Sequence, residues 1–398
     1  MTLRPAFLLL CMVGCCGFVS YNIIRMPALA SFAESLGAGP VVVGFILATS
    51  TMTGVVLKLP VGTLSDVVNR SRVMLVGVLA FAWPPFVYPL VSDVESLTVL
   101  RVFHGLATAV FMPLALATVA EMYPATRGAA LGWYTAAVQG GALLGPVLGG
   151  WLIDTVGYTH TFLAGGWFGV AALLIYLVFW WHAPAPLSGQ SADGREIRAV
   201  MANVWQGIRS VLGHLQILAA SVAEAVKMVG TGTLMAFLPL YGLSIGLSLA
   251  ESGLLFGIQG FTSFVSRPVM GLVSDRVGRR PLIAMGLMVC GGACMAIPHS
   301  VHLGGLLLCA ASFGFGEAVI TSSSAALIAD VGDGNIGAGM GLRGTVMDVG
   351  HAGGPIVAGV LVAAISYTGA FTIVGCLQVL AAVGFWVVTG QRSVAQPA

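Results

Sequence analysis

The stretch Gly62-Thr-Leu-Ser-Asp66-Val-Val-Asn-Arg70 decides the fold, because the chain carries a second copy of it. The copy is Gly271-Leu-Val-Ser-Asp275-Arg276-Val-Gly278-Arg279-Arg280, which lies 209 residues later, counted from Asp66 to Asp275. In each copy an acidic residue and basic residues follow an apolar run. A repeated helix-end motif of this kind predicts a fold that is built twice from one unit.

The offset of 209 residues also holds far outside the two motifs. Gly44 matches Gly253, and Gly145-Pro146 matches Gly354-Pro355. Further matched pairs are Lys58 with Arg267, Gly105 with Gly314, Glu121 with Asp330 and Gly128 with Gly337. More than 100 residues therefore repeat without a gap, which predicts two similar halves in parallel arrangement with a site between them at mid-membrane.

The composition places both halves in a membrane. Of the 398 residues, 58% are hydrophobic and only 8% are charged, against about 25% charged in a soluble domain. This excludes a cytosolic enzyme, a secreted disulfide protein, a disordered chain and a nucleic-acid binder. The strict apolar–polar alternation of a membrane β-barrel is also absent from the sequence. We therefore expect a polytopic helical membrane protein.

Apolar windows of about 20 residues mark helices that can cross the hydrocarbon core. The predicted spans are 5–30, 40–64, 73–92, 94–122, 127–153, 160–181, 214–242, 249–273, 281–299, 302–330, 336–363 and 367–390. The expected fold class is an all-α membrane protein with twelve helices in two pseudo-symmetric six-helix bundles.

Residues 1–181 are expected to form the first bundle and residues 214–398 the second. Residues 182–213 read as a cytosolic linker, in which apolar residues at helical spacing predict an amphipathic helix on the membrane surface. The N-terminal apolar run, with Ala28-Leu29-Ala30 at its end, also resembles a cleavable signal. We favour a first transmembrane helix, because cleavage would remove one element of the repeat.

Basic residues segregate into alternate loops and the C-terminus, whereas the intervening loops carry Glu34, Asp93, Glu95 and Asp154 and no Lys or Arg. The basic set is Arg70, Arg72, Arg127, Arg195, Arg198, Arg209, Arg276, Arg279, Arg280 and Arg392. The positive-inside rule then places both termini in the cytoplasm, in an inner, cytoplasmic membrane of bacterial type. An even number of spans also requires both termini to lie on one side of the membrane.

The repeated motif resembles the loop motif of the major facilitator superfamily: Gly, three residues, Asp, a basic residue, one residue, Gly and further basic residues. The second copy fits fully, whereas the first has Val67 and Asn69 at two defined positions. The resemblance implies a gating role, in which ion pairs hold one conformation, for Gly62, Asp66, Arg70, Gly271, Asp275, Arg276, Gly278, Arg279 and Arg280. A purely topological role for these charges is the alternative.

Two further segments carry the same resemblance. Arg101-Val-Phe-His104-Gly105 is similar to the family's fourth-helix arginine motif, with His104 where Gln is usual. The fifth-helix signature of the drug–proton antiporter branch is matched by Gly141, Gly145, Pro146, Gly149 and Gly150. Small residues let helix backbones approach closely and Pro146 favours a kink, so generic tight packing is the alternative.

Charged residues inside predicted spans are costly and therefore mark candidate positions of the substrate or proton pathway. They are Arg25, Arg101, Glu224, Lys227, Glu317, Arg343, Asp348 and His351. The arginines of the first half favour an anionic or zwitterionic substrate, and the carboxylates of the second half offer protonation sites. Structural ion pairs and charges that reach the membrane surface are the alternatives for each.

The carboxylates differ in their sequence distance from the nearest basic residue. Glu224 and Lys227 lie three residues apart on one helix face and can neutralise each other, and Asp348 and His351 share that spacing. Glu317 has no basic residue within one helical turn, which makes it the best candidate for a lone proton carrier. A cross-helix pair with Arg343 would make Glu317 structural instead.

The seven cysteines all lie in apolar runs without metal-ligand spacing, and we interpret them as packing residues. We expect no metal, no cofactor and no enzyme activity, and the chain has no Walker motif of an ATPase.

The sequence therefore predicts a secondary active transporter that exports a small organic compound, anionic or amphipathic, by proton-coupled alternating-access antiport. A solute–proton symporter or uptake permease, a uniporter and, more distantly, a non-transporting membrane sensor are alternatives. The expected partners are a small-molecule substrate, protons and the lipid bilayer, without nucleic acid. The resembled family implies a monomer.

Overall fold

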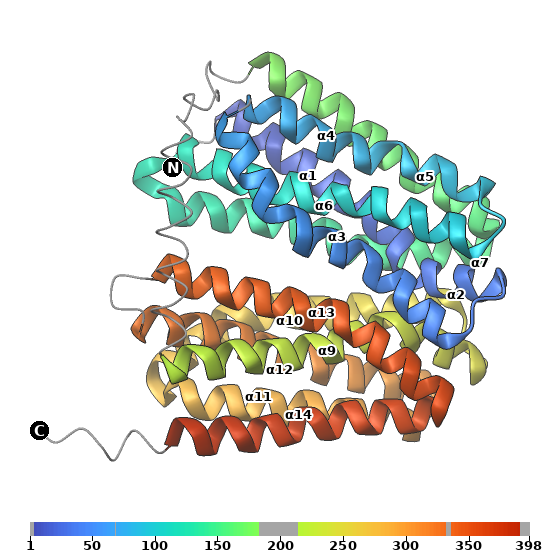
Figure 1. The fold of residues 1–398 in the computed structure, drawn as a ribbon, viewed down its shortest axis with the longest axis vertical. Helices are drawn as coiled ribbons and strands as arrows, with labels where there is room; N and C mark the ends of the chain where they lie inside the picture. The colour runs from blue at the N-terminus through green and yellow to red at the C-terminus, as the bar shows by residue number, and fades with distance from the viewer. Residues whose placement is uncertain (1–3, 68, 183–213, 332–335, 391–398) are drawn as a thin grey trace, which may run out of the picture. The chain divides into compact units, whose positions relative to one another are not determined.

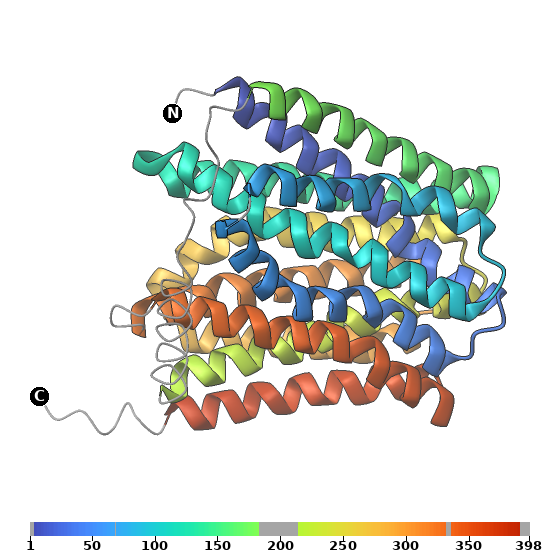
Figure 2. The ribbon, with the colours of Figure 1, turned by 45° about the horizontal axis from the view of Figure 1, so that its top comes forward.

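The computed structural model describes residues 4–67, 69–182, 214–331 and 336–390, and all its regular elements are helices (Figure 1; Figure 2). The first elements are α1 Pro5–Ile23, η1 Ile24–Ala28, α2 Leu29–Ser35, α3 Pro40–Val67, α4 Arg70–Ala82, α5 Pro84–Val87, η2 Tyr88–Leu90, α6 Val94–Met122, η3 Pro124–Thr126 and α7 Arg127–His182. The others are α9 Leu215–Ser244, α10 Leu249–Val277, α11 Arg279–Ala296, η4 Ile297–His299, α12 Leu303–Val331, α13 Ile336–Ala364 and α14 Tyr367–Gly390. The predicted all-helical fold class is confirmed.

Each predicted span coincides with a helical segment of the described chain. The spans 127–153 and 160–181 are the two arms of α7, which bends at Gly157, where φ is 78°. Ten helices of the described ranges are long and apolar enough to cross a membrane, with α7 counted once. The helix α10 is absent from these ten, since polar residues such as Gln259 and Arg267 interrupt its apolar run. The chain is a multi-pass membrane protein.

The repeat is visible in how the second helix of each half begins. Gly37 and Gly246, 209 residues apart, both adopt φ of 87°, a left-handed conformation that glycine reaches without strain. The helix α3 then begins at Pro40, and α10 begins 209 residues later at Leu249. The same turn residue therefore ends the preceding helix in both halves.

The chain separates into two compact units. Unit 1 comprises residues 1–38, 49–197 and 246–257, and unit 2 comprises residues 39–48, 198–245 and 258–398. The helices α3 and α10 each contribute to both units. The expected division at 182–213 stays a prediction, and residues 183–213, with their expected amphipathic helix, lie outside the described residues.

Close helix packing positions the charged residues of each unit. In unit 1, Phe81, Phe111, Tyr134 and Tyr176 belong to a buried core to which α1, α4, α6 and α7 contribute. In unit 2, α13 packs on α9 so closely that a Cβ at Gly354 would collide with the Val229 carbonyl oxygen of α9. Such contacts fix the helix faces on which the charges lie.

Candidate functional site

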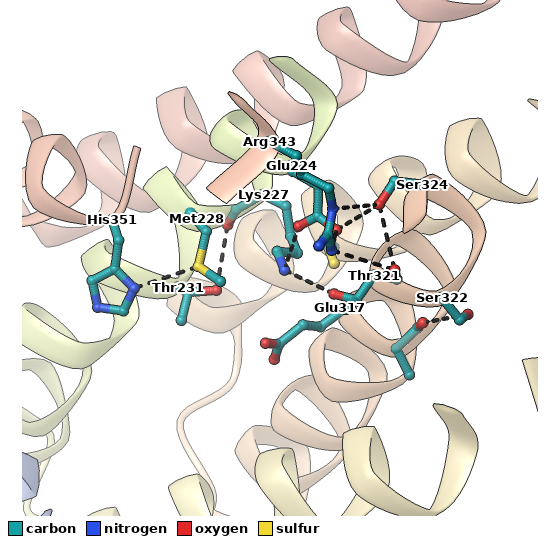
Figure 3. A network of polar contacts seen from close by, with 12 residues as sticks. Glu224, Lys227, Met228, Thr231, Glu317, Thr321, Ser322, Ser324, Arg343 and His351 are labelled. Carbon is teal, nitrogen blue, oxygen red and sulfur yellow. Dashed lines mark hydrogen bonds and ion pairs between the residues drawn. The ribbon is translucent and has the colours of Figure 1, made fainter. Parts of the chain in front are cut away.

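Unit 2 holds a buried group of three charged side chains, which we call the acid–base cluster (Figure 3). Glu224 and Lys227 lie on α9 and Arg343 lies on α13; their side chains are 0%, 1% and 14% exposed. Lys227 Nζ lies 2.8 Å from Glu224 Oε2, and Arg343 Nη2 lies 2.5 Å from Glu224 Oε1. One carboxylate thus neutralises one of two cations, so the cluster keeps a surplus positive charge.

Hydroxyl groups of α12 complete the acid–base cluster. Ser324 Oγ donates to Glu224 Oε1 at 2.6 Å, and Lys227 Nζ donates to Thr321 Oγ1 at 3.0 Å. Arg343 Nε donates to Ser324 Oγ at 3.3 Å. A buried ion is tolerated when it is paired and hydrogen-bonded in this way. The network therefore favours the ionised form of Glu224 and ties α9, α12 and α13 together.

Glu317 of α12 lies outside this network, and no dashed line reaches it in Figure 3. Its carboxylate Oε1 lies 3.9 Å from Arg267 Nη2 of α10, and the two side chains are 12% and 33% exposed. The cross-helix pair of Glu317 with Arg343 is not formed, because Arg343 binds Glu224 instead. Glu317 therefore has a looser ionic contact than Glu224.

Asp348 and His351 are half-buried on α13. His351 Nδ1 lies 3.4 Å from Met228 Sδ of α9, which places it on the α9 side of α13 (Figure 3).

Unit 1 holds a different buried group, which we call the arginine cluster: Tyr21, Arg25, Ser50, Tyr88, Arg101 and His104. The Arg101 guanidinium is fully buried and donates from Nη2 to Ser50 Oγ and from Nη1 to Tyr88 Oη, the latter at 3.3 Å. Tyr21 Oη donates to the same Ser50 Oγ at 3.0 Å. The elements α1, η1, α3, η2 and α6 each supply at least one side chain to this group.

Both arginines of the arginine cluster contact the ring of Tyr21. The guanidinium carbon lies 5.6 Å from the ring centroid for Arg25 and 5.7 Å for Arg101, which is within range of a cation–π interaction. Arg25 Nη2 also donates to Thr51 Oγ1 at 3.2 Å. Among the described residues, Arg101 contacts no carboxylate. Within this part of the chain the buried charge of Arg101 is therefore stabilised by hydroxyl groups, an imidazole and an aromatic ring, and not by a carboxylate.

The complete copy of the loop motif forms an ion-pair group at the end of α10. Arg279 Nη1 lies 2.5 Å from Asp275 Oδ1, and Arg279 Nε lies 3.0 Å from Asp330 Oδ2 of α12. Gly278 between them has φ of 97°, which a residue with a side chain rarely adopts. The remaining residues of this copy are Gly271 in α10, the exposed Arg276 and Arg280. Arg280 Nε donates to Thr389 Oγ1 at 2.9 Å.

In the incomplete copy, Arg70 Nη1 lies 2.6 Å from Glu121 Oε1. The side chain of Asp66 and the surroundings of Gly62 lie outside the described part of the chain, so the predicted gating roles of Gly62, Asp66 and Arg70 stay predictions.

The glycines of the fifth-helix signature lie against backbone of unit 1. A Cβ at Gly149 would lie 2.5 Å from the Ile23 carbonyl oxygen, and a Cβ at Gly145 would lie 2.6 Å from Asn22 Cβ. Gly141 faces the Cys15 carbonyl oxygen and Gly150 faces that of Leu249. The signature therefore marks places where two backbones touch; the antiport that it implies stays a prediction.

The sequence analysis missed the neutral members of both clusters. They are Tyr21, Ser50, Tyr88, Thr321 and Ser324. Only Tyr21 could have been found from the sequence, because it lies four residues before Arg25 and therefore on the same helix face as Arg25. The others bind charges that lie far away in the sequence.

Comparisons with known proteins agree with this architecture. The family model described as Major Facilitator Superfamily matches residues 9–241 and 220–397. An uncharacterized MFS-type transporter of Methanocaldococcus jannaschii is 23% identical over 81% of this chain and 83% of its own length. The multi-drug resistance efflux pump PmrA of Streptococcus pneumoniae is 26% identical, over 65% of each chain.

Among solved structures, a bacterial homolog of the human lysosomal transporter Spinster, inward-facing and unoccupied, has a similar fold. The TM-score is 0.81 at 15% identity, with 100% of both chains covered.

Proposed function

The chain belongs to the Major Facilitator Superfamily, and we propose that it is a secondary active transporter that exports a small organic anion in exchange for protons. The observation that carries the anionic specificity is the buried guanidinium of Arg101, whose described contacts include no carboxylate. A buried cation without a counter-ion is costly. The negative group of a substrate is the counter-ion that this position lacks.

Two observations support the export direction. The fifth-helix glycines match the signature of drug–proton antiporters, and one relative is named a multi-drug resistance efflux pump. The similarity to that pump spans 65% of either chain.

Glu317 is our candidate for the proton carrier. Glu224 has two cations and a serine hydroxyl in contact with its carboxylate, so protonation of Glu224 would leave Lys227 and Arg343 buried with no counter-ion. Within the described part of the chain Glu317 has one ionic contact, at 3.9 Å, and losing this longer contact costs less. A carboxyl group in this setting can gain and release a proton without dismantling a network.

The proposed architecture follows the repeat. Residues 1–181 and 214–398 would be two six-helix halves that alternate access to the substrate, joined by a cytosolic linker, with both termini on the cytoplasmic side of an inner membrane. The group of Asp275, Arg279 and Asp330 would then stabilise one conformation on the cytosolic side, because its ion pairs join the ends of α10 and α12.

Everted membrane vesicles with an acidic lumen test the proposal. Benzenesulfonate, a permanently ionised anion, and trimethylphenylammonium, a cation of similar size, are the two probes, and a fluorescent dye reports the lumenal pH. We expect benzenesulfonate to raise the lumenal pH only in vesicles that contain the protein, since anion entry is coupled to proton exit. Proton symport would lower the lumenal pH instead, and a response to the cation alone would contradict the proposed substrate class.

Two variants locate the function in the structure. Arg101→Gln should abolish the benzenesulfonate response, whereas Arg127→Gln, at an exposed position, should retain it. Glu317→Gln, which mimics a protonated acid, should abolish the response to the pH gradient but retain exchange of labelled benzenesulfonate. Undiminished pH-driven transport by Glu317→Gln would remove Glu317 from the mechanism.

A further inference from the structure

The imidazole of His104 forms a closed triangle with two other buried side chains of unit 1. His104 Nδ1 lies 3.0 Å from Tyr88 Oη and 3.4 Å from Arg101 Nη1, and Arg101 Nη1 lies 3.3 Å from Tyr88 Oη. All three side chains are fully buried. His104 is also the position at which the fourth-helix motif departs from the glutamine of the resembled family.

The chemistry of the three groups fixes the direction of each hydrogen bond. A guanidinium only donates, so Tyr88 Oη and His104 Nδ1 both accept from Arg101. The hydroxyl proton of Tyr88 is then left to be donated to His104 Nδ1. Both neighbours of Nδ1 are donors, so Nδ1 carries no proton. These hydrogen bonds therefore assign a neutral imidazole with its proton on Nε2.

With this tautomer, α6 carries two buried donors that have no acceptor in the described part of the chain. Arg101 Nε and His104 Nε2 are buried and have no hydrogen-bond partner among the described residues. Buried donors are nearly always satisfied, so each orphaned one points to a missing partner. The two residues are three apart on α6, one helical turn, and hence on neighbouring positions of one face.

We propose that His104 is a second, neutral donor for the anionic group of the substrate, and that it also positions the Arg101 guanidinium through Nδ1. The inference rests on the proposed function, because Arg101 supplies the charge. It adds a ligand class: an oxyanion, such as a carboxylate or sulfonate, whose several lone pairs accept from Nε–H of Arg101 and Nε2–H of His104. Rigid donors of this kind select an oxygen-bearing anion over a bare negative charge.

The ¹⁵N NMR spectrum of the full-length protein in lipid bilayers tests the tautomer directly. The seven histidines are labelled, and the signals of His104 are assigned by their loss in His104→Gln. We expect an unprotonated Nδ1 and a protonated Nε2, and we expect Tyr88→Phe to shift the Nδ1 signal. A protonated Nδ1 would overturn the inference whether or not the protein transports anions.

Binding of benzenesulfonate tests the donor role. As replacements for His104, Gln places an amide N–H close to the position of Nε2, whereas Asn places its amide only at the position of Nδ1. Met has no hydrogen-bond donor at either position. We expect the affinity of His104→Gln to exceed that of His104→Asn and His104→Met, with a loss of about tenfold for Met, the size of one net hydrogen bond to a charged group. His160→Gln, at an exposed position, is the matched control and should bind like the wild type.

The outcomes separate the two proposals. Saturation with benzenesulfonate should move the Nε2 signal of His104. Binding that depends on Arg101 but leaves that signal unmoved would overturn the role of His104 and leave the proposed function intact. No binding by the wild type, with the predicted tautomer present, would contradict the proposed function instead, and the ligand role of His104 with it.

Discussion

One helix crossing in unit 1 has a close counterpart in unit 2. A Cβ at Gly150 of α7 would collide with the Leu249 carbonyl oxygen of α10, and a Cβ at Gly359 of α13 would lie 2.5 Å from the Pro40 carbonyl oxygen of α3. Both glycines, and both oxygens, are 209 residues apart. Gly253 with Pro146 and Gly44 with Pro355 form a second matched pair of contacts. The backbone scaffold is thus repeated contact by contact.

The buried charges do not follow the repeat. The positions 209 residues after Arg101 and His104 hold Ala310 and Phe313, and the positions 209 residues before Glu224 and Arg343 hold Cys15 and Tyr134. Each unit therefore places its charged group where the other has none. Small residues at crossings preserve the fold, whereas the side chains that break the symmetry give each unit its own chemistry.

The largest effect expected from this comparison is that of Glu224→Ala. It leaves Lys227 and Arg343 buried without their shared carboxylate, and breaking a buried pair in this way costs about 3–5 kcal/mol. Cys15→Ala, at the counterpart position of α1, removes one sulfur atom and should have a far smaller effect. The unfolding midpoint of the purified proteins in detergent measures the difference.

A triple variant shows the origin of that loss. Glu224→Leu, Lys227→Leu and Arg343→Leu together remove every charge of the acid–base cluster and should restore most of the stability. If Glu224→Ala were as stable as Cys15→Ala, the acid–base cluster would not hold α9, α12 and α13 together.

The sequence predicted the scaffold well because apolar length and the 209-residue repeat determine it. All twelve predicted spans coincide with helical segments, and the Glu224–Lys227 pair followed from spacing on one helix. The partner of Arg343 could not be derived in this way, because Glu224 lies 119 residues away and the rotation of each helix decides which faces meet. The hydropathy pattern does not determine that rotation. For the same reason the sequence did not predict that Ser50 and Ser324 bind the buried charges.

The two crossings predict a smaller loss of stability, of the same sign in both units. Gly150→Ala and Gly359→Ala each push a Cβ against a carbonyl oxygen of a neighbouring backbone, which cannot rotate away. Overpacking of this kind costs about 1–3 kcal/mol. Gly140→Ala and Gly353→Ala, on the same two helices but with nothing within 4 Å, are the controls and should be neutral or mildly stabilising.

One asymmetry sharpens this prediction. The Asp154 carboxylate accepts from the backbone N–H groups of Leu249 and Ala250, at 3.3 and 2.7 Å, and so secures the crossing of unit 1. The counterpart of Asp154 is Ala363, whose methyl side chain cannot accept a hydrogen bond. Gly359→Ala should therefore lower the unfolding midpoint more than Gly150→Ala does. The reverse order would show that Asp154 does not support its crossing.

The smallest effect concerns the first turns of α6 and α12, which begin at the matched positions Val94 and Leu303. Asp93 precedes α6 and accepts from the Ser96 backbone N–H at 2.7 Å and from Ser96 Oγ at 2.9 Å, whereas its counterpart before α12 is His302. These hydrogen bonds lower the pKa of the Asp93 carboxyl, with the backbone bond as the larger cause.

Because the folded-state pKa of Asp93 lies below its unfolded value, about 3.9, the stabilisation is complete above that value and is lost as the pH falls through the folded-state pKa. Hydrogen exchange, corrected for the intrinsic rate, should therefore show the Ser96 amide well protected from pH 7 down to about 5, and less protected below about pH 4. Asp93→Ala should remove the protection of Ser96 at every pH. The Gly305 amide, at the matched position of α12, has no carboxylate before it and should not change with Asp93. Protection of Ser96 that is insensitive to both acid and Asp93→Ala would show that α6, like α12, begins without help from the residue before it.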